Sequence, residues 1–295
     1  MDLRRFKIIA IVLLAITVLF LSVNMINGRA ELDNLPESVA TDLSRLFLKS
    51  GNVLPAELIP LERNRLSVYV CAAANGAAAQ SIAQELGESK RKDGNLTDTG
   101  YLFRLESEAL VTVDHSLYFK FDGSGNGSTS ASAVTYAPNA KTRELADKLT
   151  ERFTRRYDGR EVTLCDYRLV SAAEVGSGAI LDFELFIDGL PLHGAGVTVH
   201  AKSNGTIVTA EGNGYFFPLE KQSGIARYDV INVMKKEYDS LTAEGISGLS
   251  VTSVEACYIA ITEKAAGQIC FFPGWRITYS DGTVSVYDAV NCERH

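Results

Sequence analysis

The chain has 295 residues, of which 46% are hydrophobic and 22% charged, the composition of an ordinary folded protein. Its formal net charge is −7, so we do not expect nucleic-acid binding, which requires clustered lysine and arginine. About 265 residues follow the apolar N-terminal stretch, enough for one large or two modest hydrophobic cores.

The first predicted element is a transmembrane anchor at residues 8–28. This run carries no charged side chain, and at ~1.5 Å per residue it covers about 30 Å, the thickness of a bilayer's hydrocarbon core. Arg4, Arg5 and Lys7 precede it, so the positive-inside rule places residues 1–7 in the cytoplasm and the bulk of the chain outside the cell membrane. The alternative is a secretory signal peptide cut after Ala30, but the apolar region of such a peptide has only about 7–15 residues. We therefore expect a single-pass anchor in contact with membrane lipid.

This span also carries groups that could contact a partner helix. Thr17 and Asn24 are seven residues apart and lie on nearly one face. Hydroxyl and amide groups within a bilayer can bond a neighbouring helix. The alternative is that the hydroxyl bonds its own backbone and Asn24 reaches the interface. The predicted partner-binding residues are Ala10, Leu13, Leu14, Thr17 and Asn24.

Residues 29–132 are predicted to form a membrane-proximal α+β domain. A helix begins near Pro36 and ends at Gly51, a strand covers 66–71, and a short helix covers 77–86. The polar segment 89–99 reads as a loop, and alternating apolar residues over 101–122 indicate strands. The Gly/Ser/Asn-rich stretch 122–132 is the predicted boundary.

Residues 133–295 are predicted to contain two units, each a helix followed by an antiparallel sheet. Leu145, Leu149 and Phe153 recur every four residues, as in an amphipathic helix. The strands that follow contain Asn204-Gly205, a strong hairpin pattern because both central residues take positive φ. A helix over 228–238 and three strands between 251 and 290 repeat the order. The predicted fold class is α+β, with an N-terminal transmembrane helix followed by tandem helix-plus-antiparallel-sheet units.

Catalytic and metal-binding motifs are sparse, so we predict no catalytic, cofactor-binding or metal-binding residues. The sequence lacks the G-x-S-x-G, H-E-x-x-H and Walker patterns. His193 and His200 make a poor metal site without further ligands. The segment from Asp122 resembles the start of a calcium loop, but Ala133 occupies the position of its closing glutamate.

The carboxylates and cysteines leave alternatives open. Carboxylates that a fold could pair are Asp182, Glu184, Asp188, Asp281, Asp288 and Glu293. Of the five cysteines, three lie in neighbouring C-terminal strands and could form one disulfide, whereas buried thiols are the other interpretation.

Three segments resemble the YycH/YycI family of membrane-anchored regulatory proteins. The stretch 272–282, with Trp275, followed by 286–293, is similar to that family's closing hairpin, which also occurs in PepSY-type modules. Asp288 and Cys292 stand where Asn and Gly are more usual. Residues 183–192 resemble the family's strand with its Asp-Gly-x-Pro-Leu turn, and 46–60 its membrane-proximal helix and extended exit.

The resemblance implies a non-enzymatic bacterial protein that contacts a membrane sensor histidine kinase of cell-wall homeostasis. Family members act largely through their transmembrane helices, and a paralogous regulatory protein is a further partner. Two alternatives belong to other classes. One is a PepSY-like extracytoplasmic binding or protease-inhibitory module, and the other is a cell-envelope hydrolase built from dispersed carboxylates.

Overall fold

The computed structural model describes residues 35–61, 65–72, 76–87, 90–123, 140–154, 166–175, 178–215, 219–227, 230–263 and 268–295. Most of these residues lie in strands. Thirteen strands pair into one mixed sheet in the order β10-β1-β12-β11-β8-β9-β5-β4-β3-β2, with β13 beside β12, β7 beside β8 and β6 beside β7.

The predicted fold class is therefore wrong. The strands that follow each helix do not form separate antiparallel units, because β8 pairs in parallel with β11, which lies more than fifty residues later in the chain. No helix among the described residues is long and apolar enough to cross a membrane. The predicted anchor at 8–28 lies outside the described residues, and so does the predicted domain boundary between 132 and 133.

The chain divides into two compact units. Of the described residues, one unit comprises those up to Leu66 together with Arg227–Glu255 and Ile277–Ser285, and the other comprises those within Ser67–Ala226, Ala256–Arg276 and Val286–His295. We call them the two-helix unit and the large-sheet unit.

The two-helix unit contains the α-helices α2 (Glu37–Lys49) and α5 (Val230–Ala243), with the short 3-10 helix η1 (Ala56–Leu58) after α2. The ring of Phe47, on the buried face of α2, packs against the ring of Tyr238 in α5, with 6.0 Å between the ring centroids. The side chain of Asn52, which is fully buried, accepts a hydrogen bond from the amide of Leu249 at 3.0 Å. This bond ties the end of α2 to the loop after α5.

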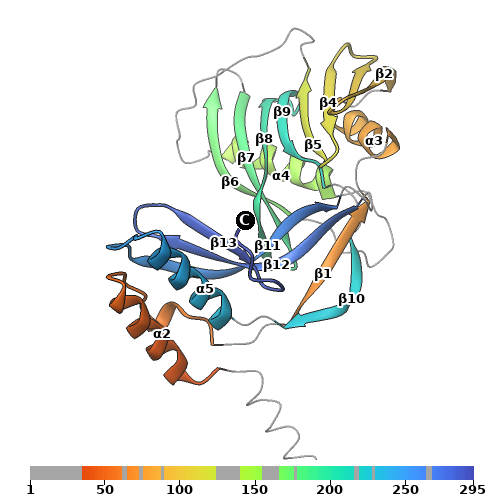
Figure 1. Ribbon diagram of the computed structural model, residues 1–295. Helices are drawn as coiled ribbons and strands as arrows, with labels where there is room; N and C mark the ends of the chain where they lie inside the picture. The colour runs from red at the N-terminus through yellow and green to blue at the C-terminus, as the bar shows by residue number, and fades with distance from the viewer. Residues whose placement is uncertain are drawn as a thin grey trace, which may run out of the picture. The chain divides into compact units, whose positions relative to one another are not determined.

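The large-sheet unit contains eight consecutive antiparallel neighbours, in the spatial order β6-β7-β8-β9-β5-β4-β3-β2 (Figure 1). Their bounds are β2 Arg91–Thr97, β3 Gly100–Leu105, β4 Leu110–Asp114, β5 Tyr118–Asp122, β6 Asp166–Val175, β7 Gly178–Ile187, β8 Leu190–Lys202 and β9 Ile207–Asn213. In β7 every second residue is buried, from Ala179 to Ile187, as expected for a sheet with one covered face.

The remaining strands are β1 (Arg65–Ala72), β10 (Glu220–Arg227), β11 (Val251–Glu263), β12 (Gln268–Tyr279) and β13 (Val284–Asp288). Position 274 in β12 requires glycine, because a Cβ there would lie 2.6 Å from the Tyr287 carbonyl oxygen. The following residue, Trp275, is buried in the core.

Several predicted elements are confirmed, and one segment is corrected. The helix predicted over 77–86 is α3 (Gly76–Gly87), and the one built on Leu145 and Leu149 is α4 (Ala140–Thr154). The predicted loop 89–99 instead contains β2, whose residues are all exposed. An edge strand that buries neither face shows no alternation of apolar and polar residues, which is why it reads as a loop.

Candidate functional site

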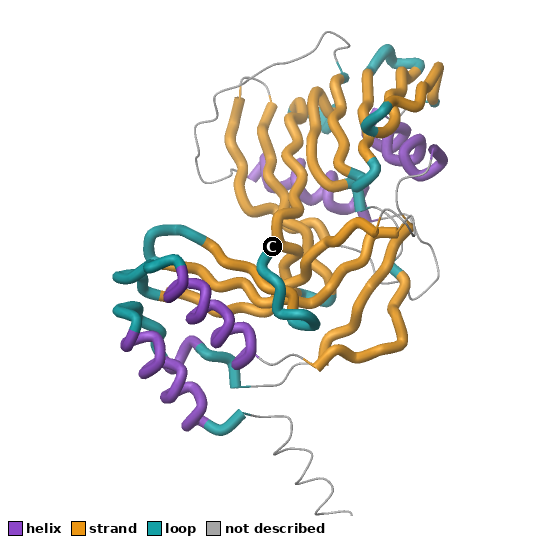
Figure 2. Tube along the Cα trace, in the orientation of Figure 1, coloured by secondary structure: helices purple, strands orange, loops and turns teal. Residues whose placement is uncertain are grey.

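Both helices of the large-sheet unit cover the same face of strands β2–β9, as Figures 1 and 2 show. A Cβ on Gly87 of α3 would lie 2.0 Å from the side chain of Leu105, a buried residue of β3. Leu145 of α4 lies close to Gly205, in the β8–β9 turn. Side chains alternate between the two faces of a strand, so the other residues of these strands point away from the helices. In the part of the chain that the structure describes, no helix covers this second face, which we call the open face.

A shallow trough of about 440 Å³ lies on the open face. It crosses strands β6, β7, β8, β9 and β5, and at ~4.8 Å between neighbouring strands it is about 19 Å long. The lining side chains that carry polar or large apolar groups include Tyr118, Val170, Asp182, Glu184, Thr198 and Glu211.

Glycines form much of the trough's floor. A Cβ on Gly212 would lie 2.1 Å from the carbonyl oxygen of Gly196, and the φ of Gly212 is +145°, so this position in β9 requires glycine. Gly196 in β8 has no side chain of its own to fill the space, and its amide donates to the side chain of Asn213 at 3.2 Å. The floor is low because the backbones of β8 and β9 are bare at these points.

Asp182 in β7 lies at the centre of a row of polar residues. It is paired with Ser171 of β6 on one side and Thr198 of β8 on the other. The hydroxyl of Thr198 donates to one carboxylate oxygen at 2.7 Å, and the hydroxyl of Ser171 donates to the other. The two neutral donors orient the carboxylate without neutralising its charge.

The other two carboxylates of the trough each face a cation. Glu184 lies 3.4 Å from the guanidinium of Arg276, and this pair is half-buried. Glu211 lies 3.4 Å from the ammonium of Lys120, and this pair is exposed. Near the first pair, burial and the positive charge of Arg276 lower the pKa of His193.

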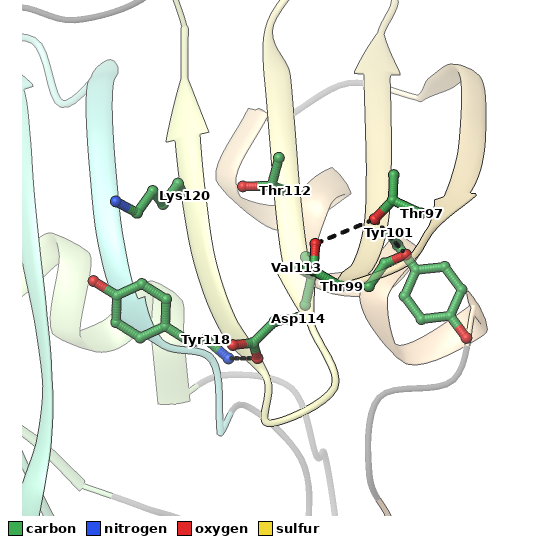
Figure 3. A pocket seen from close by; sticks show the side chains of 9 residues that line it. Thr97, Thr99, Tyr101, Thr112, Val113, Asp114, Tyr118 and Lys120 are labelled. Carbon is green, nitrogen blue, oxygen red and sulfur yellow. Dashed lines mark hydrogen bonds between the residues drawn. The ribbon is translucent and has the colours of Figure 1, made fainter.

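A second, smaller hollow of about 190 Å³ lies beside the trough on the open face, and Figure 3 shows the side chains that line it. Tyr118 and Lys120 line or flank both hollows. Asp114 is committed to the turn before β5, since one of its oxygens accepts the amides of Ser116 at 2.8 Å and Tyr118 at 2.9 Å. The smaller hollow therefore offers mainly threonine hydroxyls, the Tyr118 ring and the Lys120 side chain.

The residues that the sequence indicated as candidates lie in different surroundings in the structure. Asp182 and Glu184 come together in the trough, whereas Asp281 and Asp288 bind backbone amides of their own turns. His193 and His200 join no group of three or more ligands that could hold a metal ion among the described residues. The four described cysteines are all thiols. The predicted partner-binding residues Ala10, Leu13, Leu14, Thr17 and Asn24 lie outside the described residues.

Other residues of the trough were not predicted. Tyr118 and Val170 are far apart in the sequence, and only the strand order brings them to one surface. Gly196 and Gly212 lie in strands that look ordinary in sequence. A glycine inside an alternating strand was the one available indication, since it often marks a close backbone approach.

Comparisons with known proteins give no family assignment. No family model matches the chain, and no curated protein matches it. One similar solved structure is an uncharacterized protein from Eubacterium rectale ATCC 33656, at 13% identity and a TM-score of 0.47 over 89% of this chain and 99% of that one. A more distant structural neighbour is the Bacillus megaterium YpeB C-terminal domain, at 9% identity and a TM-score of 0.29 over 76% of this chain and 96% of that one. Such scores carry no argument about function, and the YycH/YycI resemblance stays a prediction.

Proposed function

We propose that this chain is a non-enzymatic binding protein that regulates a membrane sensor histidine kinase. The observation that carries the binding role is the trough on the open face, which presents polar and apolar side chains from five strands, with no helix of the described residues over them. Each trough carboxylate already has a hydroxyl or cationic partner, an arrangement suited to recognition. The kinase partner comes from the YycH/YycI resemblance.

The proposal includes the membrane anchor. Residues 8–28 hold the chain at the outside of the cell membrane, with the N-terminus in the cytoplasm. Ala10, Leu13, Leu14, Thr17 and Asn24 contact the transmembrane helices of the kinase, and a paralogous regulatory protein shares the complex. An anchored protein regulates a kinase when it binds one of the kinase's two conformations more tightly than the other.

The same closing hairpin supports a second candidate, a PepSY-like extracytoplasmic binding or protease-inhibitory module. In this candidate the open face binds its partner and the membrane helix is only a tether. The two candidates differ in what the membrane helix contributes.

Exchange of residues 8–26 for an unrelated span of equal length and hydrophobicity tests the proposal. The full chain is co-expressed with single membrane sensor histidine kinases, and co-purification and autophosphorylation are measured. We expect one kinase to co-purify with the native chain, and both its recovery and its activity to change with the exchanged span. Arg4, Arg5 and Lys7 are kept, so topology is preserved. If no kinase co-purifies with the native chain, the regulator proposal is wrong and the module candidate replaces it.

A further inference from the structure

We propose that the trough binds an extended segment of a partner protein through a lysine or arginine side chain that pairs with Asp182. This inference rests on the proposed function, since it states which kind of segment the partner presents to the open face.

The charges of the trough favour a cation. Of its three carboxylates, Glu184 pairs with Arg276 and Glu211 with Lys120, whereas Asp182 accepts hydrogen bonds from two neutral hydroxyls. Among the described residues, the negative charge of Asp182 at the centre of the trough is thus not offset by an ion pair. A single cationic side chain placed there neutralises the charge of Asp182.

The neighbouring strand does not supply that cation. Arg168 in β6 is paired across the strands with Glu184, but its guanidinium lies 4.0 Å over the ring of Phe186 and 3.4 Å from the carboxylate of Asp166. Stacking and an ion pair hold this arginine at its own end of the strand.

The shape of the trough favours a segment of chain over a small cation. At about 3.3 Å per residue, a length of about 19 Å holds five or six residues of extended peptide. Val170, which is 59% exposed, and Tyr118, which is 36% exposed, come from the strands at its two ends, where they can contact the residues that flank the cation. The bare floor at Gly196 and Gly212 lets a peptide backbone lie close to the sheet. An acidic segment would be repelled by the charge of Asp182 and is disfavoured.

The test is a titration of the full-length protein in detergent micelles with the peptide acetyl-Ala-Val-Arg-Val-Ala-Ala-amide, followed by ligand-observed NMR. Two analogues replace the arginine by citrulline, its neutral isostere, or by glutamate. We expect the arginine peptide to bind about three- to fivefold more tightly than the citrulline peptide, the upper part of the range for a solvent-accessible ion pair. The preference should shrink in 0.5 M NaCl, because salt screens exposed charges.

Asp182→Asn should abolish the preference for arginine over citrulline. Asp93→Asn is the matched control, because Asp93 is an exposed aspartate of the same sheet outside the trough, and it should leave the preference intact. Equal binding of the arginine and citrulline peptides to the native protein, or tighter binding of the glutamate peptide, would overturn the inference even if the Asp182 variant failed to fold. The kinase co-purification experiment fails or succeeds independently of these titrations, so the two proposals are judged separately.

Discussion

The hydroxyl of Tyr69 in β1 donates a hydrogen bond to a carboxylate oxygen of Asp188, the first residue of the two-residue turn between β7 and β8. Asp188 and Gly189 have φ of +50° and +80°, the left-handed pair that a type I′ turn requires. The Tyr69 ring also packs edge-on against the Tyr258 ring, at 5.8 Å between centroids. One tyrosine therefore holds the β7–β8 turn and contributes to the core.

Replacing Tyr69 by phenylalanine tests this bond. Tyr69→Phe keeps the ring and removes the donor, so the free energy of unfolding should fall by about 1.5 kcal/mol, the low end of the range for a hydrogen bond to a charged group. Urea unfolding followed by circular dichroism gives the value. Tyr118→Phe on the open face is the control and should change stability by less than about 0.5 kcal/mol. Equal effects of the two changes would contradict the role of the bond.

Stability should fall at alkaline pH. Burial, with a smaller contribution from Cys270, raises the pKa of Cys71 from 9.0 to about 12. Burial, with the nearby Tyr69 and Asp188, also raises the pKa of Tyr258. The folded protein thus holds these protons more tightly than the unfolded chain, so the stabilisation is complete below the unfolded pKa values and is lost as the pH rises above about 9.

Urea unfolding at pH 8, 9 and 10 measures this loss. Above the unfolded pKa, each proton held only by the folded state lowers the free energy of unfolding by about 1.4 kcal/mol for every pH unit. Cys71→Ala should make the decline between pH 9 and 10 shallower. A profile that is flat up to pH 10 in the native protein would contradict the prediction.

Local periodicity was sufficient to predict α4 and most of the strand positions, because a covered sheet face and a packed helix face leave regular apolar patterns. Leu145 and Leu149 are buried as their spacing predicts. Strand pairing could not be predicted in the same way. The parallel contact of Leu192 with Tyr258 depends on chain segments that carry no local sign of their partner.

The trough was not predictable for the same reason. The sequence places Asp182 and Glu184 on one strand, but the other residues that line the trough come from four further strands, and the cation beside Glu184 comes from β12. Alternation predicts that such residues point away from the core. It cannot predict that no helix of the described residues covers their face, or that bare backbone at Gly196 lies beside them.

The Asn204-Gly205 turn gives a prediction that also corrects the sequence interpretation. Only Gly205 has positive φ, at +89°, and the amide of Lys202 donates to the carbonyl of Thr206 at 2.9 Å, so the loop has three residues and glycine at its left-handed position. Gly205→Val should lower the free energy of unfolding by about 1–3 kcal/mol, because a β-branched residue is strained there. Gly205→Asn should cost less, since asparagine tolerates this conformation. An unchanged melting temperature for the valine variant would refute the assignment.

The carboxylate of Asp288 organises the C-terminal turn. It is 2% exposed and accepts the amides of Val290 at 2.9 Å, Asn291 at 2.6 Å and Glu293 at 3.1 Å. Asp288→Ala leaves these three amides without their acceptor and should cost about 2–3 kcal/mol of unfolding free energy. Asp288→Asn retains one accepting oxygen and should cost roughly half as much. If the two variants were equally stable in urea, the amides would not depend on the carboxylate.

Cys292, within the same turn, should be replaceable by glycine with a gain in stability. Its φ is +55°, and its amide donates to the carbonyl of Asp288 at 3.0 Å, so the turn holds a residue with a Cβ in the left-handed region. That conformation costs an L-residue about 1–2 kcal/mol. Glycine avoids this cost but loses about 0.5–1 kcal/mol through the greater freedom of the unfolded chain. The expected net gain for Cys292→Gly is therefore about 0.5–1 kcal/mol in urea unfolding. Cys292→Ala removes the thiol but keeps the Cβ, so it should bring no such gain, and alanine and glycine variants of equal stability would show that backbone strain at this position is negligible.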